Sequence, residues 1–306
     1  AAVVELGMNH PGEITRLGGI CQPDVGMITN VAPAHLEGLG TVENVAAAKG
    51  ELLATIRSGG TAILNADDVR VAALADGCPC PVLFFGVGER AGIRAENVRA
   101  DGKRLVFTLI TPSGEIDVRL ATPMQAMVAN ALAAAAAGEV LGMSLDRIKD
   151  GLEAFSPGAG RMDIRELEGG IRLLDDTYNA NPGSMAAAIE TLAAMGADGR
   201  THAVLGDMLE LGDLSHALHR KLGRAVGEAG IDRLYAAGRF AFEVAEGARK
   251  GRMTDDRIFV GTKAEIIGQL REELRAGDQI LVKGSRGMAM EEVADEIVRW
   301  ATEGNR

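Results

Sequence analysis

The chain has 306 residues and a formal net charge of −11 at pH 7. Because nucleic-acid-binding surfaces carry a basic excess, this charge argues against a nucleic-acid partner. It does not exclude a small anionic substrate. The apolar content of 47% supports a sizeable core, and the length favours two domains.

The first third of the chain alternates strand-like and helix-like segments. Strand patterns cover residues 3–6, 25–30 and 61–64, and helical patterns cover residues 13–20 and 44–56. Alternation of this kind predicts βα units that feed a mostly parallel sheet.

The pattern then changes to consecutive strands. Residues 82–85, 104–110 and 116–120 are strand-like, with turn signals at Asp101-Gly102 and Ser113-Gly114, which predicts an antiparallel part of the same sheet. Two helices are predicted next, at residues 124–141 and 145–155. The breakers in Ser156-Pro157-Gly158-Ala159-Gly160 then indicate a domain boundary, which gives a first domain of residues 1–158 and a second of residues 159–306.

Beyond that boundary the βα alternation resumes. Strands are predicted at residues 171–174, 203–205, 233–236, 258–260 and 279–282, with helices between them. The expected fold class is therefore α/β throughout, and the second domain is a Rossmann-like, doubly wound sheet whose ligands bind beyond the carboxyl ends of its strands.

The cysteines and the apolar runs indicate where the protein works. Cys21, Cys78 and Cys80 are an odd number without a disulfide framework, which fits a reducing compartment. Asn130 and Glu139 interrupt the most hydrophobic run, so no stretch reaches the roughly 18 apolar residues of a membrane span. We also expect no signal peptide at the start of the chain. We expect a cytoplasmic protein without membrane insertion.

Two motifs are interpreted as structural. Gly86-Val87-Gly88-Glu89-Arg90-Ala91 imitates a dinucleotide fingerprint, but polar strands follow where a helix is needed, so a turn is predicted. His216 and His219 lie three residues apart on a helix without a nearby third ligand, which favours a solvated helix face over a metal site.

Three residues of the first domain are candidates for a metal site. His35 follows the strand at residues 25–30 and Glu5 ends the strand before it, so a carboxylate and an imidazole could share a divalent cation, and a structural role stays open. Lys49 reads most simply as a surface lysine. If it is buried among its small neighbours, its neutral amine can take up carbon dioxide as a metal-bridging carbamate.

Polar turns follow three predicted strands of the second domain. They span residues 175–182, 206–212 and 283–287. Helix capping explains Asn181 and Pro182, but it does not explain Asp176, Tyr178 and Asn179. Three polar turns on one rim of a sheet indicate a binding site.

Together these segments resemble the Mur ligases. The resemblance rests on motifs in the family's order along almost the whole chain, namely Glu5-Leu6-Gly7-Met8-Asn9-His10, residues 29–37, Ala48-Lys49-Gly50-Glu51, and residues 175–182, 205–212 and 283–287. It implies a partial central ATP-binding domain followed by a Rossmann-like domain. It further implies an ATP-dependent ligase of peptidoglycan synthesis that forms an acyl phosphate, and it is closest to the branch that joins D-alanyl-D-alanine to a UDP-linked muramoyl tripeptide.

The resemblance also implies roles for individual residues. Glu5 and His35 match magnesium ligands, and Lys49 matches a lysine that is carbamylated to support a second Mg²⁺. Asn130, Arg161 and Asp176 match contacts to ATP. The expected substrate contacts are Asn9, His10, Tyr178, Asn179, Asp207, Lys283, Ser285 and Arg286. A monomer is expected.

The chain departs from the family in two ways. It contains no Gly-rich loop ending in Gly-Lys-Thr, since its only Gly-Lys pair is Gly102-Lys103, and it lacks the domain that holds the uridine nucleotide. Met124-Gln125-Ala126 also stands where relatives carry Gly-x-His. We therefore expect a fragment that is inactive alone. The alternatives are a non-catalytic homologue, or a folate- or cyanophycin-type amide ligase.

Overall fold

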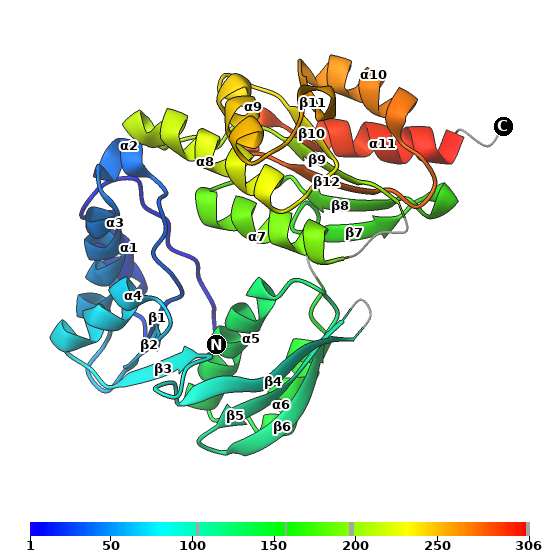
Figure 1. Cartoon of the computed structure of the whole chain (residues 1–306). Coiled ribbons are helices and arrows are strands. Elements are labelled where there is room, and N and C mark those ends of the chain that lie inside the picture. Colours follow the sequence, from blue (N-terminus) through cyan, green and yellow to red (C-terminus); the bar gives the residue numbers. More distant parts are fainter. Residues whose placement is uncertain (102–103, 157, 196–198, 304–306) are drawn as a thin grey trace. The chain divides into compact units, whose positions relative to one another are not determined.

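The computed structural model describes residues 1–101, 104–156, 158–195 and 199–303. The chain divides into two compact units, Ala1–Ser156 and Pro157–Arg306. Each unit is a sheet flanked by helices (Figure 1). Pro157 of the predicted linker, the Gly102-Lys103 pair and the second residue of the Asp101-Gly102 turn lie outside the described residues.

The first unit contains a six-stranded sheet in the order β1-β2-β3-β4-β5-β6. The first four strands are parallel, and β4, β5 and β6 pair antiparallel, so the predicted mixed sheet is confirmed. The strands are β1 Val25–Ile28, β2 Thr61–Asn65, β3 Val82–Gly86, β4 Ile93–Asp101, β5 Arg104–Thr111 and β6 Gly114–Leu120. Strand β4 was not predicted, because only Ile93 and Ala95 of it are buried and the remainder is polar.

The strand predicted at residues 3–6 is wrong. Residues 1–8 have no regular structure, and Val3 and Val4 are exposed. A strand needs a neighbour to pair its backbone groups, and residues 3–6 pair with none of the strands of the described sheet. An apolar run alone was therefore not enough to predict a strand at residues 3–6.

Helices cover both faces of the first sheet. They are α1 Glu13–Cys21, α2 Leu36–Leu39, α3 Val42–Gly50, α4 Val69–Ala73, α5 Ala126–Val140 and α6 Leu145–Glu153. Helices α5 and α6 pack on the face that carries Ile63 and Phe85. Helices α1 to α4 pack on the face that carries Ile28 and Leu64. The helix predicted at residues 44–56 is α3 followed by a 3-10 turn, Glu51–Thr55.

The second unit is the doubly wound sheet that the sequence predicts. Its strand order is β11-β10-β9-β12-β8-β7, and all neighbours are parallel except β7 and β8. The strands are β7 Asp163–Glu166, β8 Arg172–Asp176, β9 Thr201–Leu205, β10 Arg233–Ala236, β11 Ile258–Val260 and β12 Gln279–Lys283. The short edge strand β7 was not predicted, since none of its four residues is fully buried.

Five helices cover this second sheet in the described part of the unit: α7 Pro182–Ala194, α8 Ser215–Glu228, α9 Ala241–Lys250, α10 Lys263–Glu273 and α11 Glu291–Glu303. Helices α10 and α11 pack on the face that carries Leu173, Val204 and Val282. Helix α7 packs against β9 and β12, and α9 packs against β10 and β11, on the other face (Figure 1). Both faces are thus buried, as parallel sheets require.

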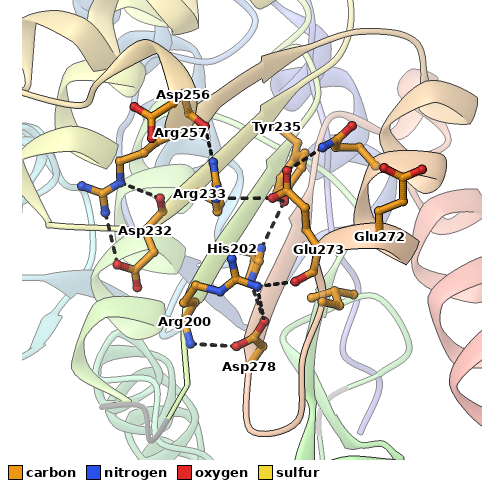
Figure 2. Close-up of polar contacts among 12 residues, drawn as sticks. Arg200, His202, Asp232, Arg233, Tyr235, Asp256, Arg257, Glu272, Glu273 and Asp278 are labelled. Atoms are coloured by element: carbon orange, nitrogen blue, oxygen red, sulfur yellow. Dashed lines mark hydrogen bonds and ion pairs between the residues drawn. The ribbon is translucent and has the colours of Figure 1, made fainter.

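A polar network lies at the amino ends of β9, β10 and β12 (Figure 2). His202 is fully buried, with Nε2 2.9 Å from an Asp278 oxygen. The Tyr235 hydroxyl donates to Glu273 at 2.7 Å, and burial raises the pKa of Tyr235. These buried side chains therefore have partners inside the network, which offsets the cost of taking them out of water. Among the described residues, no helix is both long and apolar enough to cross a membrane.

Candidate active site

The carboxyl ends of β8, β9 and β12 meet at one rim of the second sheet. In the strand register Lys283 stands opposite Asp176 on one side and Leu205 on the other. The three polar turns singled out in the sequence therefore leave the sheet at the same level, as predicted.

An ion pair joins the first and third turns. The Lys283 ammonium is 2.5 Å from an Asp176 carboxylate oxygen and donates to the Asn179 carbonyl at 2.9 Å. The other Asp176 oxygen accepts from the Met162 amide at 3.0 Å. Burial lowers the pKa of Lys283, and the charge of Asp176 opposes that shift. These contacts show that both side chains stabilise the backbone of the rim.

Ser285 links all three turns. Its hydroxyl donates to the Ala180 carbonyl at 3.2 Å and accepts from the Leu209 amide at 2.9 Å. Its own amide donates to the Asp207 carbonyl at 2.9 Å. One buried side chain, 3% exposed, thus fixes the spacing of turns whose contact residues lie 76 and 105 positions earlier in the sequence.

Several polar side chains of this rim reach solvent, and four of them can donate hydrogen bonds. The Arg161 guanidinium lies 3.8 Å from the centre of the Tyr178 ring, and both side chains are exposed. The Asn179 side chain is exposed, and its oxygen accepts from the Ala180 amide at 2.8 Å. Arg286 is 66% exposed and pairs with Glu291 at 3.0 Å. A buried frame therefore presents a cluster of exposed donors, an arrangement suited to an anionic or amide-bearing ligand.

Asp207 contributes in a way that the sequence did not indicate. Its carboxylate accepts from the amides of Arg239 at 2.7 Å and Phe240 at 3.0 Å, in the loop that follows β10. A substrate contact was expected at Asp207, but its side chain is buried and both oxygens bind this backbone. The carboxylate brings a fourth loop to the rim.

The prediction of a solvated helix face is correct for His216 and wrong for His219. His216 is exposed and its Nδ1 is 2.6 Å from a Glu243 oxygen. His219 is fully buried, with hydrogen bonds to Met208 and Ser215. The signal that could have revealed it is the helical spacing of His219 with Leu222 and Val226, which places all three on the inner face.

In the first unit, Lys49 is not an ordinary surface lysine. Its side chain is partly buried, and its ammonium donates to the Asn30 carbonyl at 2.6 Å. Burial lowers the pKa of Lys49, while the Asp68 carboxylate opposes the shift. Asp68 also accepts from the Val31 amide at 2.6 Å, which holds the loop after β1 beside this lysine. No local pattern in the sequence singled out Asp68.

Glu5 and His35 lie in irregular backbone. Glu5 is exposed in the segment before α1, and His35 adopts φ 56 immediately before α2. Within the described residues no group of three or more His, Cys, Asp or Glu side chains could hold a metal. A cation bound by Glu5 and His35 would therefore need further ligands other than the His, Cys, Asp and Glu side chains of the described residues.

The other predicted residues of the first unit lie at its surface. The amides of Asn9 and His10 donate to the Glu13 carboxylate at 2.7 and 3.0 Å. Asn130 is exposed on α5, and its amide contacts the Met127 sulfur at 3.4 Å. None of these contacts prevents the three side chains from meeting a ligand.

The Gly86-Val87-Gly88 segment is a turn, as predicted. The amides of Val87 and Gly88 donate to the Asp67 carboxylate at 2.7 and 3.2 Å. Strand β4 follows it, where a dinucleotide site needs a helix. A carboxylate of the chain itself thus occupies the position that a phosphate would take.

Comparisons with known proteins agree on one family. The Mur ligase middle domain matches residues 1–138, and the glutamate ligase domain of Mur ligases matches residues 160–286. The UDP-N-acetylmuramoyl-tripeptide--D-alanyl-D-alanine ligase of Escherichia coli is 39% identical over 95% of this chain and 64% of its own length. The chain therefore spans a little less than two thirds of the length of this curated relative.

Solved structures give the same result. The crystal structure of MurF from Acinetobacter baumannii is similar with a TM-score of 0.88 and 33% identity, over 97% of this chain and 64% of that one. MurF from Thermotoga maritima in complex with ADP is similar with a TM-score of 0.84 and 26% identity, over 98% of this chain and 67% of that one.

Proposed function

The chain belongs to the Mur ligase family, and from this premise we propose that it forms the catalytic and amine-binding part of an ATP-dependent ligase. The enzyme joins D-alanyl-D-alanine to a UDP-linked muramoyl tripeptide in peptidoglycan synthesis, as the names of its relatives say of them. The observation that carries this proposal is the convergence of three separate turns on Ser285 and Lys283 at one rim.

The rim suits a zwitterionic dipeptide. Arg286 offers an exposed guanidinium to its carboxylate, and the Asn179 amide offers a neutral donor. Lys283 and Asp176 bind each other and the backbone, and we infer that they act on the dipeptide mainly through the turns that they hold. They hold Asn179 and the turn after β12 in place, so that the amine meets its acyl partner in a fixed orientation.

The residues of the first unit fit a magnesium ion. Glu5 supplies a carboxylate and His35 an imidazole, and Mg²⁺ usually takes one or two protein ligands together with water and substrate phosphates. A bound Mg²⁺ would neutralise charge on the transferring phosphoryl group. The lowered pKa of Lys49 favours the neutral amine that carbamylation needs, and the carbamate would then support a second ion. The family resemblance makes Asn130 and Arg161 candidates for contact with the nucleotide.

Binding of the dipeptide to this chain tests the proposal. Titrating D-alanyl-D-alanine into the ¹⁵N-labelled chain should shift the amide signals of Asn179, Ser285 and Arg286, and L-alanyl-L-alanine should not. Replacing Arg286→Ala should weaken binding by at least about tenfold, because a charge-assisted hydrogen bond is worth roughly 1.5–3 kcal/mol. Arg249→Ala is the matched control, since Arg249 is also an exposed arginine with one carboxylate partner, Asp255. Shifts confined to other regions would reject the site.

The 306 residues alone should give no turnover, because the Gly-Lys-Thr loop that binds phosphate in the family is not among them. Phosphate release by this chain with ATP, Mg²⁺, the nucleotide-linked tripeptide and D-alanyl-D-alanine should equal the rate without the dipeptide. Dipeptide-dependent release at a normal ligase rate would contradict this expectation.

A further inference from the structure

His219 lies in the interior beside the rim, and the function proposed above gives it no part. Its side chain is 0% exposed. Nδ1 is 2.7 Å from the Ser215 carbonyl, and Nε2 is 2.9 Å from the Met208 amide nitrogen. A carbonyl oxygen only accepts and an amide N–H only donates, so the proton must sit on Nδ1 and the lone pair on Nε2. The contacts therefore require a neutral imidazole in one tautomer.

The ring also contacts the loop after β10. Phe240 stacks on it with ring centres 4.6 Å apart and an interplanar angle of 25°. Asp207, next to Met208, accepts from the amides of Arg239 and Phe240. Gly238 has φ 112, and a Cβ there would overlap the Asp207 carboxylate. His219 and Asp207 thus fix the turn of residues 206–212 and the loop of residues 238–240 against each other.

We propose that His219 is a positioning residue for the dipeptide site, acting as a neutral imidazole that holds the Met208 amide. Through that bond it sets the course of the turn that carries Asp207 and Leu209. The Leu209 amide donates to Ser285, the residue that joins the three turns of the rim. The proposal rests on the proposed function only for the identity of the ligand.

Acid should release this anchor. A proton on Nε2 would place two N–H donors face to face, His219 against Met208. An alternative acceptor is the Asp207 oxygen that lies 3.9 Å from Nε2, and a shift toward it would draw Asp207 from the Phe240 amide. Burial lowers the pKa of His219, the Ser215 carbonyl, Asp207 and Glu243 oppose this shift, and His216 adds to it. The anchor is therefore intact at neutral pH and is lost on acidification.

An NMR measurement on the whole chain tests the hydrogen bond without any ligand. At pH 7 the Met208 amide nitrogen and Nε2 of His219 should show scalar coupling across the bond, and long-range ¹H–¹⁵N spectra should show the proton on Nδ1. Both signatures should disappear on acidification, and His216 on the same helix is the exposed reference. Missing coupling at pH 7, or a proton on Nε2, would overturn the proposal, whether or not the dipeptide binds.

Two substitutions then connect the bond to the site. His219→Gln keeps an acceptor for the Met208 amide, whereas His219→Leu fills the space and leaves that amide unpaired. We expect dipeptide binding to weaken about tenfold in the Leu variant and to stay within about threefold in the Gln variant, because only the Leu variant orphans a buried donor. His216→Gln is the surface control and should bind normally.

Equal losses of dipeptide affinity in both His219 variants, or no loss in the Leu variant, would reject the proposal that His219 positions the site through this hydrogen bond. If the wild-type chain binds no dipeptide, the proposed function fails and the coupling measurement still decides the role of His219.

Discussion

The two ends of the second sheet both bury charged side chains, but they use them differently. At the amino end, His202 pairs with Asp278 and Tyr235 pairs with Glu273, and Asp278 also accepts from two backbone amides (Figure 2). At the carboxyl rim, Asp207 and Ser285 bind the backbone of loops. Both sets of buried side chains hold the fold together, but the set at the rim also supports the exposed side chains of Arg161, Asn179 and Arg286, which can meet a ligand. Burial of charge alone therefore does not identify a site.

The largest effect should come from breaking the amino-end network. Asp278 accepts from the amides of Arg200 at 2.8 Å and Arg275 at 3.0 Å as well as from His202. Asp278→Ala leaves these donors unpaired, so we expect a loss of about 3–5 kcal/mol in the free energy of unfolding. Urea denaturation followed by the fluorescence of Trp300, the single tryptophan, measures it.

The control for that measurement is Asp255→Ala, which removes an exposed carboxylate paired with Arg249 and should cost less than about 1 kcal/mol. Under conditions where the Asp278→Ala variant is folded, its affinity for D-alanyl-D-alanine should be unchanged. Weaker dipeptide binding by the folded variant would show that the two ends are not separable.

A substitution at the rim should reduce stability less than Asp278→Ala does, but it should weaken dipeptide binding more. Asp176→Asn removes the charge partner of Lys283 but keeps an oxygen that can accept its hydrogen bond, so we expect a loss of about 2–3 kcal/mol in the free energy of unfolding, below that for Asp278→Ala. The Asp176 charge raises the pKa of Lys283, so the variant should lower that pKa further. Denaturation, dipeptide titration and the pH dependence of the Lys283 side-chain signal measure the three effects. A variant that binds the dipeptide normally would contradict the role of this pair.

Mild acid should weaken both ends at once. Burial lowers the pKa of His202 at one end and of His219 at the other. The unfolded chain therefore binds more protons than the folded one below about pH 6.5, so the stability from these groups is present above that pH and is lost as the pH falls toward the folded values. Denaturation curves at a series of pH values on either side of neutrality measure the effect, which His202→Gln and His219→Gln should each reduce. A stability that rises as the pH falls through this range would contradict the sign.

The smallest effect should come from the exposed pair of Arg161 and Tyr178. Arg161→Leu removes a guanidinium that lies 3.8 Å from the ring centre, and exposed pairs of this kind contribute about 0.5–1 kcal/mol. Stability should therefore hardly change. ADP affinity should fall if Arg161 meets the nucleotide, and calorimetric titration of ADP into both chains measures it. Equal ADP affinities of the two chains would show that Arg161 does not contact the nucleotide.

Local patterns in the sequence were enough to predict the fold class, the doubly wound second unit and the turns that form its rim. Apolar runs mark the parallel strands, and polar residues directly after a strand must lie at its carboxyl end, so Asp176 and Ser285 could be placed on one rim. Such features are readable from short segments because they follow from the period of one element and its direction in the sheet.

Which polar side chains are buried, and what they hold, became apparent only in the packed molecule. His219 lies on a helix with charged neighbours, which predicted a solvated side chain, yet its partner Met208 lies 11 residues earlier, in the turn after β9. Asp207 reads as a ligand contact, yet its amide partners lie 32 and 33 residues later. In the first unit, the partial burial of Lys49 depends on Asn30 and Asp68, which approach it only after the βα units pack. The helical spacing of His219 with Leu222 and Val226 could have indicated its burial, but no local pattern identifies Met208 as its partner, because partner choice is a property of packed elements.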